Sequence, residues 1–329
     1  MRLLISTRRS RVVSALAMLG LTISVAFATM APATAVPTAT LLVTGLASGS
    51  GSTIGPDGAL YVTEGAAGRV SRVDPQTGAV TTFASGLPPS IVGIGGAMDV
   101  EFRGKTAYVL VTLVGPDVGG DDIVGIYKVD GPDEFTVIAD IGAWSLANPP
   151  TTDFFIPTGV QYAMERYGNG FLVTDGHHNR VLGVTLSGTV TEVIAFGNIV
   201  PTGLETRGST VFMAEAGPVP HLPQDGKIVS FKKRIDEVTE IAAGGPLLVD
   251  VEFGKGKDLF GLAQGVFTPG NPEGSPANPN TGQLLEVDGQ GGFTVLVEGL
   301  NQPTSLEIIG STAYVVTLGG EIWKIDNIA

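Results

Sequence analysis

A repeated four-strand unit constrains the fold of this chain more than any other feature. The unit is clearest in residues 55–87, where tight turns at Pro56-Asp57-Gly58 and at residues 74–78 separate short segments with strand character. Its second strand recurs as Leu-Tyr-Val or a close variant. The copies lie at residues 60–62, 107–109, 170–172, 211–213, 258–260 and 313–315. Their spacing, at about 40–60 residues, overlaps the period of propeller blades.

Three further strands accompany each copy of this landmark. The expected inner strands are residues 51–54, 98–102, 157–160, 201–204, 249–253 and 303–306. The expected third strands are residues 69–73, 125–129, 180–184, 227–231, 283–287 and 321–325, and the outer strands are residues 79–84, 135–139, 189–195, 237–242 and 293–297. Six antiparallel units predict an all-β protein, a six-bladed β-propeller domain over residues 36–329.

The sixth unit lacks an outer strand, because the chain ends soon after its third strand. Residues 40–46 match residues 294–300, which form the outer strand of the fifth unit and the turn after it. This match predicts that the N-terminal strand closes the ring, with Leu41 and Val43 buried on one face, since closure removes open sheet edges. The alternative is a disordered linker whose match is coincidental.

Residues 1–35 differ from the rest of the chain and are excluded from the fold. They begin with four arginines, continue with an apolar run over residues 12–28 and end in Ala33-Thr34-Ala35. This order is typical of a secretory signal peptide with an A-x-A cleavage site, so we expect a secreted, extracellular protein. A retained membrane anchor is the alternative.

The charge and the absence of cysteine exclude several classes of function. The chain has 19 basic and 32 acidic residues, and the first 35 residues hold four of the basic and none of the acidic ones, so the remainder has a net charge of −17. This charge argues against binding to nucleic acid or to an anionic membrane. Without cysteine there are no disulfides or thiolate metal sites. The expected partner is a small molecule or an extracellular protein.

The insertions cluster on one predicted face of the ring. Strands alternate in direction within a blade, so loops between second and third strands share a face with the connections between blades. The long segments on this face are residues 115–122, 145–155, 217–226 and 265–282. Binding residues usually lie on such loops. The alternative is that these segments are tolerated insertions.

Acidic residues on this face are the first candidates for a site. Asp99 and Asp250 occupy the same repeat position on two inner strands and are candidate ligands for Ca²⁺ or another divalent metal, which prefers oxygen ligands. Glu64, Asp175 and Glu215 end second strands and are candidate ligand-binding residues. Alternatively, such acids end strands by accepting hydrogen bonds from loop amides.

All three histidines of the chain fall on the same face. His177 and His178 follow Asp175, and His221 lies in the equivalent loop of the next unit. They are candidate ligand-binding residues, and a histidine–carboxylate metal site or a general base is conceivable. The alternative is that they are loop residues without a role. The sequence contains no G-x-S-x-G or H-E-x-x-H motif, so catalytic residues remain unassigned.

Two resemblances rest on these residues. Asp175, Asn179 and Arg180 resemble the conserved positions of an NHL-type blade. Most of residues 36–329 resembles the ScyD/ScyE family of exported propellers. The matching segments are residues 55–62, 96–100, 106–111, 148–150, 200–203 and 302–304. This resemblance implies an exported six-bladed propeller, and many members of the family have no assigned activity.

A more distant resemblance is to the gluconolactonase (SMP-30) and strictosidine-synthase propellers. Those lactonases hold a divalent metal in the channel through an acid on the first inner strand and through ligands from later blades. The resemblance implies Asp99 and Asp250 as later ligands, while residues 51–54 carry no acid. Two hypotheses follow: a scaffold that binds a ligand or a protein, and a metal-dependent hydrolase such as a lactonase.

Overall fold

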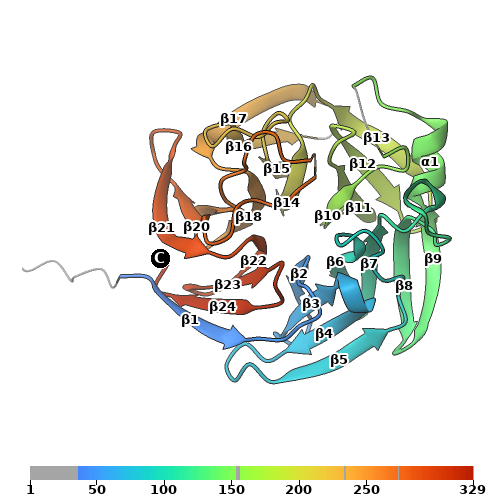
Figure 1. Cartoon of the computed structure of the whole chain (residues 1–329), viewed down its shortest axis with the longest axis horizontal. Helices are drawn as coiled ribbons and strands as arrows, with labels where there is room; N and C mark the ends of the chain where they lie inside the picture. Colours follow the sequence, from blue (N-terminus) through green and yellow to red (C-terminus); the bar gives the residue numbers. More distant parts are fainter. Residues whose placement is uncertain (1–35, 153–155, 233–234, 273, 329) are drawn as a thin grey trace, which may run out of the picture. The chain divides into compact units, whose positions relative to one another are not determined.

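The computed structural model describes residues 36–152, 156–232, 235–272 and 274–328. These residues form six four-stranded antiparallel sheets that surround a centre as the blades of a propeller (Figure 1), which confirms the predicted fold class. The predicted signal peptide lies outside the described residues. No helix formed by the described residues has the length and apolar character needed to cross a bilayer.

Each blade runs from an inner to an outer strand. Blades 1 to 3 consist of β2 (Ser52–Ile54), β3 (Leu60–Glu64), β4 (Arg69–Val73) and β5 (Val80–Ser85); β6 (Gly96–Arg103), β7 (Thr106–Thr112), β8 (Gly125–Gly131) and β9 (Glu134–Asp140); and β10 (Gln161–Tyr167), β11 (Gly170–Asp175), β12 (Arg180–Thr185) and β13 (Val190–Ala195). Blades 4 to 6 consist of β14 (Pro201–Arg207), β15 (Thr210–Glu215), β16 (Gly226–Lys232) and β17 (Ile235–Gly245); β18 (Leu248–Phe253), β19 (Leu259–Ala263), β20 (Gly282–Val287) and β21 (Phe293–Leu300); and β22 (Pro303–Ile309), β23 (Thr312–Thr317), β24 (Ile322–Asp326) and β1 (Thr38–Val43).

The N-terminal strand closes the ring as predicted. β1 pairs antiparallel with β24, with Thr40 opposite Lys324 and Leu41 opposite Trp323. The predicted burial of Leu41 is wrong, because its side chain is 42% exposed. The register shifts between Leu41 and Val43, so Val43, at 7% exposure, is the β1 side chain that enters the core.

The predicted inner strand of blade 3 is also wrong in position. We expected residues 157–160, but β10 begins at Gln161. Residues 156–159 form a turn instead, in which the Gly159 amide donates to the Ile156 carbonyl oxygen. Gly159 has a φ of +86°, and a Cβ there would lie 2.2 Å from Asp175 Oδ1, so the turn requires glycine. This conformation is incompatible with an extended strand.

A short helix, α1 (Ile141–Ala147), follows β9 where the sequence predicted only a long connection. Asp140 caps it, since its Oδ1 accepts a 2.7 Å hydrogen bond from the Ala143 amide. Two 3₁₀ turns, η1 (Gly65–Ala67) and η2 (Pro116–Val118), lie in the loops after β3 and β7.

The core consists of apolar clusters between neighbouring blades. Between blades 1 and 2, the ring of Tyr61 packs edge-on against Phe83 and Phe102, at centroid distances of 4.9 and 4.7 Å. This packing holds the inner strands in place, and these strands line the centre of the ring.

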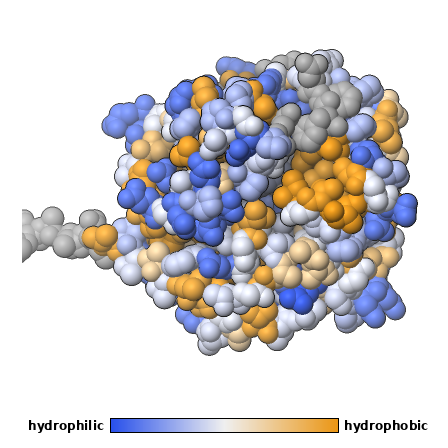
Figure 2. All heavy atoms as spheres, in the orientation of Figure 1, coloured by the Kyte–Doolittle hydropathy of each residue, from blue (hydrophilic) through white to orange (hydrophobic). Residues whose placement is uncertain are grey.

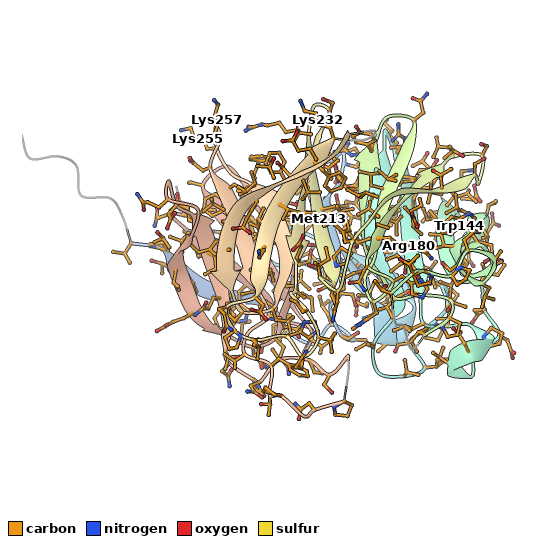
Figure 3. All side chains as sticks on the ribbon, turned by 90° about the horizontal axis from the view of Figure 1, so that it is seen from above. Trp144, Arg180, Met213, Lys232, Lys255 and Lys257 are labelled. Atoms are coloured by element: carbon orange, nitrogen blue, oxygen red, sulfur yellow. The ribbon has the colours of Figure 1, made fainter. Side chains whose placement is uncertain are left out.

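The two ends of the propeller differ. Lys232, Lys255 and Lys257 mark the end with short turns, and the long loops lie at the opposite end (Figure 3). Each inner strand starts at the long-loop end. We call this end the loop face.

Candidate functional site

Side chains from several blades form a pocket on the loop face, which we call the loop-face pocket. Its volume is about 130 Å³. Its apolar wall includes Ile94, Met98, Leu113, Val160, Val200, Leu247, Val249 and Leu318, and its polar groups include Ser50, Tyr162, His177, Thr202, His221, Gln264 and Thr304. Figure 2 shows this face, with apolar surface beside the central hollow.

Two of the three predicted histidines line this pocket. His177 follows β11 and is half-buried, and His221 lies in the β15–β16 loop and is buried. His221 Nδ1 lies 2.9 Å from the Gly217 carbonyl oxygen, and its ring packs edge-on against Phe267. The pKa of His177 is lowered to about 4, chiefly by burial and also by His178, while Asp175 acts in the opposite sense. His177 is therefore a neutral imidazole at physiological pH.

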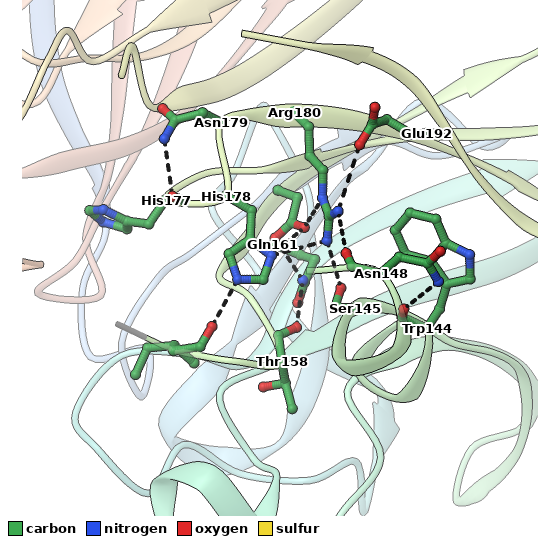
Figure 4. Close-up of polar contacts among 12 residues, drawn as sticks. Trp144, Ser145, Asn148, Thr158, Gln161, His177, His178, Asn179, Arg180 and Glu192 are labelled. Carbon is green, nitrogen blue, oxygen red and sulfur yellow. Dashed lines mark hydrogen bonds and ion pairs between the residues drawn. The ribbon is translucent and has the colours of Figure 1, made fainter. Parts of the chain in front are cut away.

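His178, although adjacent in sequence, belongs to a different environment. Its Nδ1 lies 2.9 Å from Asp175 Oδ2 and its Nε2 lies 2.9 Å from the Ile156 carbonyl oxygen. Arg180 donates through Nε to the same Asp175 oxygen at 2.8 Å. The His177 side chain extends away from this network (Figure 4). Asp175 and His178 thus hold blade 3 and its loop together beside the pocket.

The predicted acids Glu64 and Glu215 occupy the same strand-end position as Asp175. Glu64 is buried and accepts hydrogen bonds from Arg69 at 2.7 and 2.6 Å. Glu215 is also buried and lies opposite Lys227 in the strand register, and burial raises its pKa to about 7 despite that lysine. Neither residue is in the lining of the loop-face pocket. A ligand-binding role for either one stays a prediction.

Beneath the pocket, the inner strands enclose a narrow polar space that we call the acidic channel. Ser50, Met98, Tyr162 and Thr304 line both compartments, so the channel continues directly from the pocket floor. The acidic residues in its lining are Asp99, Glu101, Glu165, Asp250, Glu252 and Glu307. The volume accessible inside is only about 40 Å³.

Asp99 and Asp250 connect neighbouring blades through backbone amides. Asp99 Oδ1 accepts from the Val100 amide at 2.8 Å, and its Oδ2 accepts from the Met164 amide at 2.6 Å. Asp250 makes the equivalent bonds, at 2.9 Å to the Val251 amide and 2.7 Å to the Leu306 amide. Both oxygens of each carboxylate therefore already have backbone donors.

Metal binding by these two aspartates stays a prediction. Across the described residues, no three side chains of His, Asp or Glu are grouped as metal ligands. A metal at these carboxylates would share oxygens that already accept hydrogen bonds from backbone amides.

Five glutamates at one repeat position were missed by the sequence analysis. The strand registers place them at the same level of five inner strands, with Thr53 at that level in the first. They are Glu101, Glu165, Glu205, Glu252 and Glu307. The signal was present, because each glutamate follows Val, Met or Leu in an inner strand.

Carboxyl groups gathered in this way hold protons more tightly than usual. Burial raises the pKa of Glu101 to about 7, although Arg166 opposes the shift, and burial with the charge of Glu101 raises that of Glu165 to about 8. The pKa of Glu252 is also raised by burial and by the charges of neighbouring glutamates. The acidic channel is therefore partly protonated at neutral pH.

The stability of the fold should consequently fall at alkaline pH. The raised pKa values of Glu101, Glu165 and Asp250, about 7, 8 and 7, mean that the folded state binds these protons more tightly than the unfolded chain. Their contribution to the free energy of unfolding is complete below about pH 4 and is lost as the pH rises through 7 to 8. The lowered pKa of His177 opposes this only below its ordinary value of 6.5. We expect Tm to fall by about 3 °C or more between about pH 6.5 and 9.

Glu165→Gln should flatten this slope, because it removes one ionising group while its side-chain oxygen can still accept from Thr206. The matched control is Glu298→Gln on the exposed side of β21, which should keep the slope. A Tm in the unmodified protein that stays constant or rises over this range would contradict the prediction.

Comparison with known proteins shows which fold the chain has and does not show its activity. No protein family and no curated protein matches the sequence. A gluconolactonase from Xanthomonas campestris is 9% identical with a TM-score of 0.61, over 88% of this chain and 89% of that chain. A PQQ-bound aldose sugar dehydrogenase from Streptomyces coelicolor is 13% identical with a TM-score of 0.57, over 90% and 99%.

A virginiamycin B lyase from Staphylococcus aureus is also similar, at 13% identity and a TM-score of 0.54, over 88% of this chain and 98% of that chain. Identities this low show the fold alone, and they leave membership of the ScyD/ScyE family a prediction. The chain is thus a six-bladed β-propeller that shares its fold with gluconolactonase-like, dehydrogenase and lyase propellers.

Proposed function

We propose that this chain is an exported propeller of the ScyD/ScyE type that binds a small organic molecule in the loop-face pocket. The observation that carries the proposal is the pocket itself, in which apolar side chains and two histidines from different blades converge above the channel. A concave, mostly apolar site with a few polar groups is the usual form of a small-molecule site.

The scaffold supports binding more directly than it supports hydrolysis. Backbone hydrogen bonds fix part of the pocket wall, such as the 2.9 Å bond from the Gly176 amide to the Val160 carbonyl oxygen, which favours a preformed site. Metal-dependent hydrolysis at Asp99 and Asp250 is the second hypothesis. A divalent metal at about one per chain in the purified protein, lost in Asp99→Asn, would favour it.

The binding proposal is tested with a fluorescent probe. N-phenyl-1-naphthylamine is apolar, uncharged and brightens when it leaves water. We expect saturable binding to a chain that begins at Val36, and a loss of affinity of about tenfold or more in Val160→Trp, because the larger ring fills the pocket.

The control is Val80→Trp on the exposed side of β5, far from the pocket lining. It makes the same change of side chain and should bind the probe normally. Equal binding by both variants, or no saturable binding at all, would contradict the proposed function.

A further inference from the structure

The space above the channel has two connected parts. The loop-face pocket, at about 130 Å³, opens into an outer hollow of about 460 Å³. Ile94, Leu113, Val160, His177 and Leu318 line both parts. A cavity of about 150 Å³ is large enough for benzene, so the inner part is the size of one aromatic ring and the outer part holds a second group.

Among the residues that the structure describes, the lining of both parts contains no Asp, Glu, Lys or Arg. The outer hollow adds Val92, Val118 and Ile156 to the apolar wall. Val92 is 48% exposed at this rim. An apolar ligand would remove this surface from water, which favours binding.

The hydroxyl groups of Tyr162, Thr202 and Thr304 in the pocket lining are already engaged. Tyr162 donates to the Thr304 carbonyl oxygen at 3.1 Å, and the Thr304 hydroxyl donates to the Gly49 carbonyl oxygen at 3.1 Å. The Thr202 hydroxyl donates to the Leu248 carbonyl oxygen at 2.9 Å, and Gln264 Oε1 accepts from the Ala277 amide. A ligand with many polar atoms would find few partners here and would lose its hydration.

The acidic channel opposes a negative charge in the pocket. Ser50 and Met98 belong to the pocket and to the channel alike, so a bound anion would face the carboxyl groups of the channel. Glu101, Glu165 and Asp250, with pKa values of about 7, 8 and 7, are ionised above about pH 8 and would then repel the anion. The net charge of −17 over residues 36–329 adds repulsion at longer range.

We propose that the loop-face pocket selects an uncharged, mainly apolar ligand with two ring-sized groups and rejects an anion of the same shape. The inference deepens the proposed function and rests on it. The apolar walls of the pocket favour an uncharged, apolar ligand, and the carboxylates of the acidic channel repel an anion.

The test compares two probes that share one skeleton. N-phenyl-1-naphthylamine is neutral, and 8-anilino-1-naphthalenesulfonate is the same skeleton with one sulfonate. We expect the chain that begins at Val36 to bind the neutral probe at least about tenfold more tightly at about pH 8.5. If the two probes bind equally well and both are lost in Val160→Trp, the selectivity is wrong while the proposed function stands. If neither binds, the proposed function itself fails.

A second comparison separates charge from size. Glu165→Gln removes one carboxylate of the acidic channel without changing the pocket lining. We expect it to raise the affinity for the sulfonate probe by about twofold or more and to leave the neutral probe unaffected. If the sulfonate is excluded equally by both proteins, its size is the reason, and the charge selectivity is overturned.

Discussion

A chain that starts at Leu46, and therefore lacks β1, is expected to melt about 5–15 °C below a chain that starts at Val36 and to self-associate. β1 supplies the outer strand of blade 6 and pairs with β24 from Thr38 opposite Asp326 to Val43 opposite Ile322. Its loss exposes that edge of β24. It also removes the buried Val43 and the partly buried Leu42 from a cluster that includes Val316 and Ile322. Burial of two such side chains is worth roughly 2–5 kcal/mol. An open strand edge also promotes association between chains.

The measurements are thermal unfolding and size-exclusion chromatography. Two point variants distinguish burial from mere chain length. Val43→Asp places a charge in the core and should reproduce much of the loss, whereas Leu41→Lys, at an exposed position on the same strand, should change Tm little. If the shortened chain melted like the longer one and stayed monomeric, closure of the ring would not contribute to stability.

Arg180→Leu is expected to destabilise the fold by about 3–5 kcal/mol, because it leaves a buried carboxylate without its cation. Arg180 is 1% exposed and Asp175 is fully buried. Besides its bond to Asp175, Arg180 donates to the Asn148 carbonyl oxygen at 2.8 Å and to Ser145 Oγ at 3.2 Å, and it stacks over Trp144 at 4.8 Å (Figure 4). Denaturant unfolding followed by Trp fluorescence measures the loss directly.

The control is Arg72→Leu. Arg72 pairs with Asp57 at 2.7 Å, but both side chains are exposed, so this change should destabilise the fold far less than Arg180→Leu. Arg180→Leu combined with Asp175→Asn should cost less than the sum of the two single changes, since the double variant leaves no buried charge. If the losses of the two single variants added up in the double variant, or if Arg180→Leu were as stable as Arg72→Leu, the buried ion pair would not account for the predicted loss of stability.

The architecture could be predicted because its determinants are local and repeated. Turn residues and alternating strands mark each blade, and the match between residues 40–46 and 294–300 revealed the closing strand. The errors arose where tertiary contacts override a local pattern. Pro157-Thr158-Gly159 resembles Pro201-Thr202-Gly203, yet only the second begins a strand, because Gly159 turns against Asp175 in blade 3.

The site could be predicted only in part. The sequence placed the histidines on the loop face, and His177 and His221 do meet in one pocket. It could not separate His177 from its neighbour His178. That separation depends on Asp175 and on the Ile156 carbonyl oxygen, which hold the second ring inside blade 3.

The protonation of the acidic channel could not be predicted from the sequence. Every one of its glutamates is visible as a repeated residue, but their pKa values depend on ring closure, which brings strands from different blades around one narrow space. Likewise, Asp99 and Asp250 were recognisable as equivalent acids, while their hydrogen bonds to the Met164 and Leu306 amides join neighbouring blades across 65 and 56 positions of sequence. The blades, their order and the closing strand follow from local sequence patterns, since turns and alternation act over a few residues. The protonation of the acids and the position of each histidine depend on the folded arrangement of the blades, because burial and Coulomb interactions depend on distances in space.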